Sequence, residues 1–223
     1  MNQPTTPPVY AAFDYSYTSP AIAIWDSSKP FTAENIFFYA LTKTKKYQGL
    51  FGNVRISQYP DNALSDVERF YAMSTWSENV LAQHGVTHAR IEEYAYGKGG
   101  NSKSQAGRAF QLAENTGMLK YVLYVNQVPF DSVSPTHVKK YFTGKGQFRG
   151  ENGKKLSDRE KKLPMILEAY ERLGIKIHEQ IGADAEHIKP VDDICDAFAI
   201  LCTMEGVPAQ AKVLPKPPKG KKK

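Results

Sequence analysis

The sequence has few cysteines, no long apolar run and no paired histidine motif. Its 223 residues include two cysteines, Cys195 and Cys202, which lie in an apolar run and which we interpret as packed thiols. A disulfide framework or a zinc site would need more Cys or His nearby. No stretch reaches the roughly 18 uncharged apolar residues that span a membrane, and residues 1–8 lack the basic flank and apolar run of a signal peptide. We therefore expect a soluble, cytoplasmic protein without a membrane partner.

The sequence lacks the motifs of two common classes, the serine or cysteine hydrolases and the nucleotide-binding enzymes. The histidines are scattered, with no ligand spacing and no obvious nucleophile partner, so a serine or cysteine hydrolase has little support: His84, His88, His137, His178 and His187. The segment Gly97-Lys-Gly-Gly100 lacks the Walker spacing and its terminal Gly-Lys-Ser/Thr. We therefore expect no nucleotide cofactor and interpret this segment as a flexible loop.

Positive charge is concentrated in two segments of the chain. The formal net charge is +6, and the last twelve residues alone carry six Lys and no acid. Residues 139–162 carry nine Lys and Arg against three acids, which is 9 − 3 = +6, so the rest of the chain is near 6 − 6 − 6 = −6. Segregated charge of this kind suits a protein that neutralises phosphates at chosen places. A solvated loop and a solubility tail are the alternative interpretation.

Hydropathy patterns predict an α/β domain. β-branched and aromatic runs predict five strands, near residues 9–15, 21–25, 35–41, 88–94 and 128–133. Helical spacing of apolar residues predicts helices near 62–83, 103–126, 135–141, 157–173 and 191–204. This order indicates a mixed five-stranded sheet with helices on both faces. We expect a flexible lead at 1–8, one domain at 9–205 and a disordered basic tail at 206–223.

Acidic residues occur inside otherwise apolar elements. Asp14 lies in the first strand and Glu92 or Glu93 ends the fourth, while three aspartates open the last helix: Asp192, Asp193 and Asp196. Removing a lone carboxylate from water costs several kcal/mol, so such acids need a partner. At about 100° per residue, Asp193 and Asp196 border the buried stripe of the helix, whereas Asp192 is expected nearer solvent as a cap. Each acid taken singly fits a cap or a surface charge.

Several converging carboxylates have no common partner except a cation. Oxygen ligands of this type favour Mg²⁺ or Mn²⁺ over zinc. Hydrolysis of phosphodiesters by two metal ions requires such an arrangement, because one ion activates the attacking water and the other stabilises the leaving oxygen.

Four groups of residues occur in order along the chain: Ala-Phe-Asp-Tyr-Ser at 12–16, Ile-Glu at 91–92, Pro-Thr-His-Val-Lys at 135–139 with Gly-Lys-Gly at 144–146, and Asp-Ile-Cys-Asp-Ala at 193–197. Together these motifs resemble those of the RuvC-type Holliday junction resolvases over about residues 9–205. The resemblance implies an RNase H-like fold and a crossover junction endodeoxyribonuclease that nicks branched DNA, usually as a homodimer. It also implies two Mg²⁺ ions, replaceable by Mn²⁺, held by Asp14, Glu92, Asp193 and Asp196.

The chain also departs from this family. The usual Gly-Ile-Asp-Pro-Gly signature is Ala-Phe-Asp-Tyr-Ser here, and an insertion at 147–160 separates Gly146 from Lys161 and Lys162. These departures and the basic appendages favour a distant member, of the kind a phage could encode. The DNA-binding candidates are aromatic residues after the glutamate, a lysine in the Gly-rich loop and lysines of the basic segment: Tyr94, Tyr96, Lys98, Lys139, Lys145, Lys161 and Lys162.

Two other functions stay open at this point. A nuclease of the same superfamily that acts on RNA:DNA hybrids or flaps would use the same four acids. A non-catalytic DNA-binding scaffold would keep the basic segments without needing the metal. Branch specificity, and with it a role in DNA recombination and repair, comes from the resemblance alone.

Overall fold

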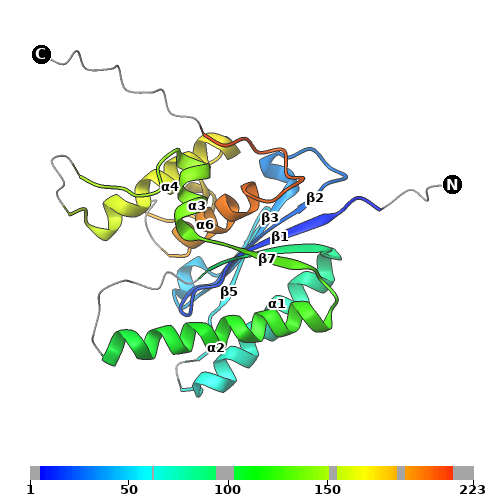
Figure 1. The fold of residues 1–223 in the computed structure, drawn as a ribbon, viewed down its shortest axis with the longest axis vertical. Helices are drawn as coiled ribbons and strands as arrows, with labels where there is room; N and C mark the ends of the chain where they lie inside the picture. Colours follow the sequence, from blue (N-terminus) through cyan, green and yellow to red (C-terminus); the bar gives the residue numbers. More distant parts are fainter. Residues whose placement is uncertain (1–5, 62, 94–102, 151–154, 185–188, 213–223) are drawn as a thin grey trace, which may run out of the picture.

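The computed structural model has one seven-stranded mixed sheet with helices on both faces, which confirms the predicted α/β class (Figure 1). It describes residues 6–61, 63–93, 103–150, 155–184 and 189–212, with the side chains at 103–106 and 108 outside the description. The strands are β1 (Val9–Asp14), β2 (Ala21–Asp26), β3 (Ile36–Thr42), β4 (Gly49–Phe51), β5 (Val54–Gln58), β6 (His88–Glu92) and β7 (Phe130–Val133). The helices are α1 (Asp66–His84), α2 (Lys103–Val125), α3 (Pro135–Thr143), α4 (Asp158–Leu173), α5 (Ile177–Gln180) and α6 (Val191–Cys202).

The strand order is β4-β5-β3-β2-β1-β6-β7, so β1 lies inside the sheet. β2 is antiparallel to β1 and to β3, whereas β6 is parallel to β1 and β7 is parallel to β6. Side chains alternate between the two faces of a strand. In β1, Tyr10 and Ala12 therefore belong to one core, and Ala11 and Phe13 to the other.

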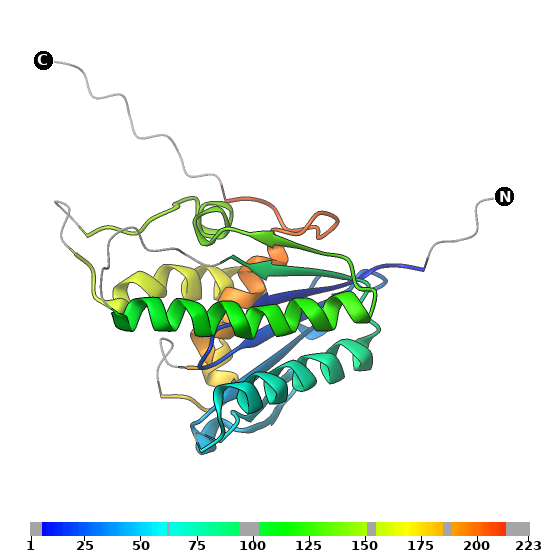
Figure 2. The same cartoon turned by 60° about the horizontal axis from the view of Figure 1, so that its bottom comes forward.

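Two helical layers cover the two faces of the sheet. Figure 1 shows α3, α4 and α6 on one side and α1 with α2 on the other. Figure 2 shows the long α2 running beside α1, and these two helices pack on each other. Helix α6 packs directly on β1, β2, β3 and β6 and is covered in turn by α3 and α4. No helix in the described part of the chain is both long enough and apolar enough to cross a bilayer.

Local capping residues explain where the helices begin and end. Ser65 begins α1 and Ser157 begins α4, and each forms a capping box with the glutamate three residues later. Pro135 opens α3, as predicted, because its missing N–H is unneeded in the first turn. Gly85 and Gly144 end α1 and α3 in the left-handed conformation that glycine adopts without steric cost.

The sheet has seven strands and not the five that the sequence predicts. The additional hairpin is β4 and β5, which joins the edge of the sheet beside β3. β4 has three residues, two of them exposed; it begins at Gly49 and is followed by Gly52, and both glycines have positive φ. A segment this short and exposed has too little apolar patterning to be distinguished from a turn.

The described chain also continues past the domain end predicted at 205. Val207 is buried, the backbone N–H of Lys212 donates to the Tyr141 carbonyl, and Tyr141 donates its hydroxyl to the Ala209 carbonyl. Arg172 of α4 donates to the Gln210 carbonyl at 2.8 Å. The first part of the segment predicted as a tail therefore lies against α3 and α4, and residues 213–223 lie outside the described residues.

A substitution of Phe198 in α6 tests how this helix packs on the sheet. Its ring stacks on Phe31 at 6.1 Å and meets Phe38 and Phe142 edge-on at 6.2 and 5.7 Å between centroids. We expect Phe198→Ala to lower the free energy of unfolding in urea by about 3–5 kcal/mol, because the site is too crowded to collapse. Leu167→Ala, at a half-exposed position of α4, should cost less than about 1 kcal/mol. Equal losses in the two variants would contradict this packing.

Candidate active site

Two strand ends place carboxylates side by side. Asp14 is the last residue of β1 and Glu92 is the last residue of β6. The two strands run parallel, and each acid follows directly on the paired residues Phe13 and Ile91. Because side chains alternate, Asp14 lies on the same face as Ala12, which belongs to the core beneath α6. Both acids therefore approach α6 from the sheet.

Helix α6 supplies the other acids. Asp192 and Asp193 lie in its first turn and Asp196 one turn later, and the first two are fully buried. Asp14, Glu92 and Asp196 are partly buried and keep some accessible surface. The acids at 14, 92, 193 and 196 thus meet where three elements distant in sequence come together.

The pKa shifts show that these acids are close enough to affect one another. The pKa of Asp14 is raised well above its ordinary value, first by burial and then by the charges of Asp193, Asp196 and Glu92. Burial and Asp196 raise the pKa of Glu92 to about 7, and burial and Asp193 raise the pKa of Asp196 to about 6. Burial also raises the pKa of Asp193, against the opposing effects of Lys189 and Ser19. The cluster consequently resists full ionisation.

Three lysines from three segments offset part of this charge. Lys139 of α3 lowers the pKa of Glu92, Lys162 of α4 forms an ion pair with Asp192, and Lys189 lies 3.4 Å from Asp193. With all five acids ionised, the site carries −5 + 3 = −2, so a divalent cation is the natural complement.

Asp192 differs from its prediction as a solvent-facing cap. It is buried, and Lys162 reaches across from α4 to pair with it. The helical stripe correctly identifies the face that packs on the sheet, but α4 covers the far side of α6, so that side is buried too. Amphipathic periodicity cannot show burial by a second layer of helices.

The acids have the right chemistry to bind a hard divalent cation, but their side chains are not arranged around a metal position. Across the described parts of the chain, no group of three or more His, Cys, Asp or Glu side chains forms a cluster ready to hold a metal ion. Yet the buried oxygens Asp192 Oδ1 and Asp193 Oδ2 have no hydrogen-bond partner in the part of the chain that the structure describes. A buried carboxylate oxygen without a protein partner is expected to contact a bound ion or a water molecule. The donors are all carboxylate oxygens, the type that Mg²⁺ and Mn²⁺ select.

The predicted DNA-binding residues fall into two groups. Lys139 and Lys162 lie beside the acids, Lys145 is exposed directly after α3, and Lys161 pairs with Asp158 at 2.8 Å on the surface. Tyr94, Tyr96 and Lys98 lie outside the described residues. The sequence prediction missed Lys189, which precedes Pro190 and so lies outside the helix that carries Asp193.

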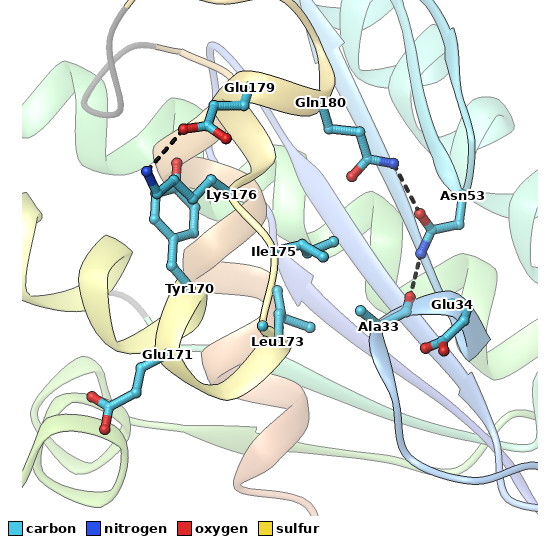
Figure 3. A pocket seen from close by; sticks show the side chains of 11 residues that line it. Ala33, Glu34, Asn53, Tyr170, Glu171, Leu173, Ile175, Lys176, Glu179 and Gln180 are labelled. Carbon is cyan, nitrogen blue, oxygen red and sulfur yellow. Dashed lines mark hydrogen bonds and ion pairs between the residues drawn. The ribbon is translucent and has the colours of Figure 1, made fainter.

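A cavity of about 1190 Å³ lies away from these acids. Figure 3 shows Gln180 of α5 directed toward Asn53, beside Ile175 and the end of α4. Asn53 precedes β5, which runs parallel to β3 and hence in the direction of β1, so it lies at the opposite end of the sheet from Asp14. This cavity therefore does not belong to the carboxylate site.

No protein-family model matches the chain, and no curated protein matches it by sequence. Among solved structures, Thermus thermophilus RuvC in complex with a Holliday junction substrate matches with a TM-score of 0.53 and 14% identity, over 87% of this chain and 90% of that one. Another Thermus thermophilus RuvC structure matches with a TM-score of 0.51 and 16% identity, over 86% and 90% of the two chains. The chain has a RuvC-like, RNase H-type fold. Yeast mitochondrial Holliday junction resolvase Ydc2 is a weaker likeness, with a TM-score of 0.47 and 13% identity over 86% and 75%.

The RuvC-like fold confirms the predicted RNase H-like architecture, apart from the number of strands. At 14–16% identity the likeness establishes the fold, while the assignment of function depends on the carboxylate site within it.

The raised pKa values predict how the metal-free protein responds to pH. Asp196 and Glu92 bind protons more tightly when folded, so their contribution to stability is complete below about pH 4 and is lost as pH rises to about 7. We expect Asp196→Asn to raise the melting temperature at pH 8 in a chelator by about 3–6 °C, and to change it little at pH 4. Asp184→Asn, which removes an exposed ion pair with Lys46, should not stabilise the protein. A gain at pH 4 as large as that at pH 8 would contradict the assignment.

Proposed function

We propose that this protein is a metal-dependent endonuclease that nicks four-way and other branched DNA. The observation that carries the proposal is the meeting of Asp14, Glu92, Asp193 and Asp196 at one end of the sheet in a RuvC-like fold. Acids from three separate elements share no structural task there that a cap or a surface charge would explain. Phosphodiester hydrolysis does require such a set of oxygen ligands.

The four acids have different positions within the site. Asp14 interacts with each of the other three, so it is the residue suited to hold two Mg²⁺ ions, with Glu92 on one side and the α6 aspartates on the other. When bound, Mg²⁺ would lower the pKa of the attacking water and stabilise the leaving oxygen, and Mn²⁺ would substitute for it. The accessible surface of Asp14, Glu92 and Asp196 leaves an approach for a phosphodiester.

The lysines around the site are suited to bind the DNA backbone. Lys139 and Lys162 lie next to the acids, and Lys145 is exposed on the loop after α3. Each phosphate contact steepens the dependence of DNA affinity on salt by about one unit of slope. Lys161, Tyr94, Tyr96 and Lys98 remain predicted contributors.

The outer face of α1 and α2 is suited to a second copy of the chain. Large apolar side chains are exposed on both helices: Val67, Tyr71, Phe110, Tyr121, Tyr124 and Val125. A groove of about 630 Å³ lies between the helices, and its lining includes Val67, Phe70 and Tyr71 of α1 and Met118 of α2. A monomer rarely leaves so many large apolar groups in water. A four-way junction is resolved by two symmetric cuts and each chain carries one carboxylate site, so a homodimer through this face fits the proposed reaction.

The substitution Asp14→Asn tests the catalytic assignment. We expect it to reduce nicking of a mobile four-way junction in Mg²⁺ by at least about 100-fold, because a ligand shared by two ions is worth more than an outer-shell contact. Junction binding in Ca²⁺, measured by gel shift, should remain. Asp26→Asn is the matched control, since Asp26 ends β2 at the opposite end of the same strand pair. Nicking by Asp14→Asn at the normal rate would exclude this site.

A panel of substrates tests the specificity of cleavage. Four-way, three-way and flap DNA and RNA:DNA hybrids are compared at equal concentration in Mg²⁺. We expect the four-way junction to be cut fastest. Faster cleavage of hybrids or flaps would assign the protein to another RNase H-like activity, and no metal-dependent cleavage of any substrate would favour a DNA-binding scaffold.

The proposed dimer makes a separate prediction. We expect Tyr124→Asp, a charge placed in the apolar face of α2, to convert the protein from dimer to monomer in sedimentation analysis without lowering its melting temperature by more than a few degrees. Leu50→Asp, at an exposed position of β4, is the control and should leave the dimer intact. A monomeric unmodified protein at micromolar concentration would overturn the proposed dimer.

A further inference from the structure

Lys189 lies where two parts of the candidate active site meet. Its ammonium donates a hydrogen bond to Ser19 and lies 3.3 Å from Thr18 Oγ1, both in the loop that follows Asp14. It also lies 3.4 Å from Asp193 Oδ1 on α6. Ser19 and Asp193 are buried, whereas the Lys189 side chain is 47% exposed. The lysine therefore reaches from the surface into a buried polar pocket and links the β1–β2 loop to α6.

The charge of Lys189 acts on most of the carboxylate cluster. It lowers the pKa of Asp14, Asp193 and Asp196, against the larger effect of burial at each of them. Lys162, from α4, is held by Asp192, and Lys139 lies toward Glu92. Among these lysines, Lys189 lies on the side of the cluster formed by Asp14 and Asp193.

A divalent cation bound at Asp193 would lie next to Lys189. Lys189 engages Oδ1 of Asp193, while Oδ2 has no hydrogen-bond partner among the described residues. A divalent cation at that carboxylate would repel the ammonium across a few ångströms in a partly desolvated site. The half-exposed stem of Lys189 can turn toward solvent, as long lysine side chains do at a surface.

We propose that Lys189 is a positioning residue that serves as the internal counter-ion of the carboxylate cluster and competes with the divalent cation for Asp193. The inference rests on the proposed metal-dependent function. In the absence of a metal, Lys189 holds Asp193 and the β1–β2 loop in their functional arrangement. When a cation binds, Lys189 withdraws toward solvent.

Titration with MnCl₂ alone, by calorimetry and without DNA, tests the competition. We expect Lys189→Met to bind Mn²⁺ roughly tenfold more tightly than the unmodified protein, within the usual 5- to 150-fold range for coupled sites. Lys189→Arg should bind about as the unmodified protein does, because it keeps the charge. Lys176→Met removes a lysine paired with Glu179 at the other end of the sheet and should also have no effect. A residue with a merely structural role would weaken binding when replaced, so unchanged or weaker binding by Lys189→Met overturns the proposal.

Stability of the metal-free protein gives an independent readout. At pH 8 in a chelator, we expect Lys189→Met to lower the melting temperature, and the added substitution Asp193→Asn to restore most of the loss, because the two groups interact directly. Additive effects of the two substitutions would overturn the counter-ion role. If the unmodified protein binds no Mn²⁺, the proposed metal-dependent function fails, and this cycle still decides whether Lys189 is the counter-ion.

Discussion

Burial of acidic residues on helix α6 is the constraint on which the rest of the site depends. The helix is enclosed by the sheet on one side and by α3 and α4 on the other, yet its first two turns carry Asp192, Asp193 and Asp196. Such a helix is tolerated only if each carboxylate finds a cation or gives up its charge. The aromatic packing around Phe198 holds α6 between Phe38 of β3 and Phe142 of α3. Helix α6 also packs on β1, so the contacts that build the core bring the acids to Asp14.

The lysines show how this charge is distributed. Lys139, Lys162 and Lys189 reach the acids from three different segments, and each has one end near the surface. They offset repulsion incompletely, because the pKa values of Glu92 and Asp196 are still raised. The protein therefore keeps a destabilising cluster that a divalent cation would relieve, as is common where function and stability oppose each other.

Local patterns in the sequence predicted most elements and several of their ends. Ser157 and Pro135 start helices, and Gly85 ends one, because capping and proline geometry act within a few residues. The hairpin of β4 and β5 was missed because its apolar pattern is too weak to predict strands. It belongs to the sheet through the pairing of β5 with β3. The position of Asp192 was wrong for a related reason, because a second helical layer buries the side expected to face solvent.

The sequence by itself determined the element types, the two basic segments and the acids placed among apolar residues, because these follow from periodicity, capping and composition over short distances. Only the tertiary structure decided which acids meet. Asp14 and Glu92 become neighbours through the parallel pairing of β1 with β6, and Asp193 joins them because α6 crosses that pair. Likewise, Lys189 becomes part of the site through contact with the β1–β2 loop, 170 residues away in the chain. Contacts between residues so far apart in the chain form only in the complete fold, and no local sequence pattern predicts them.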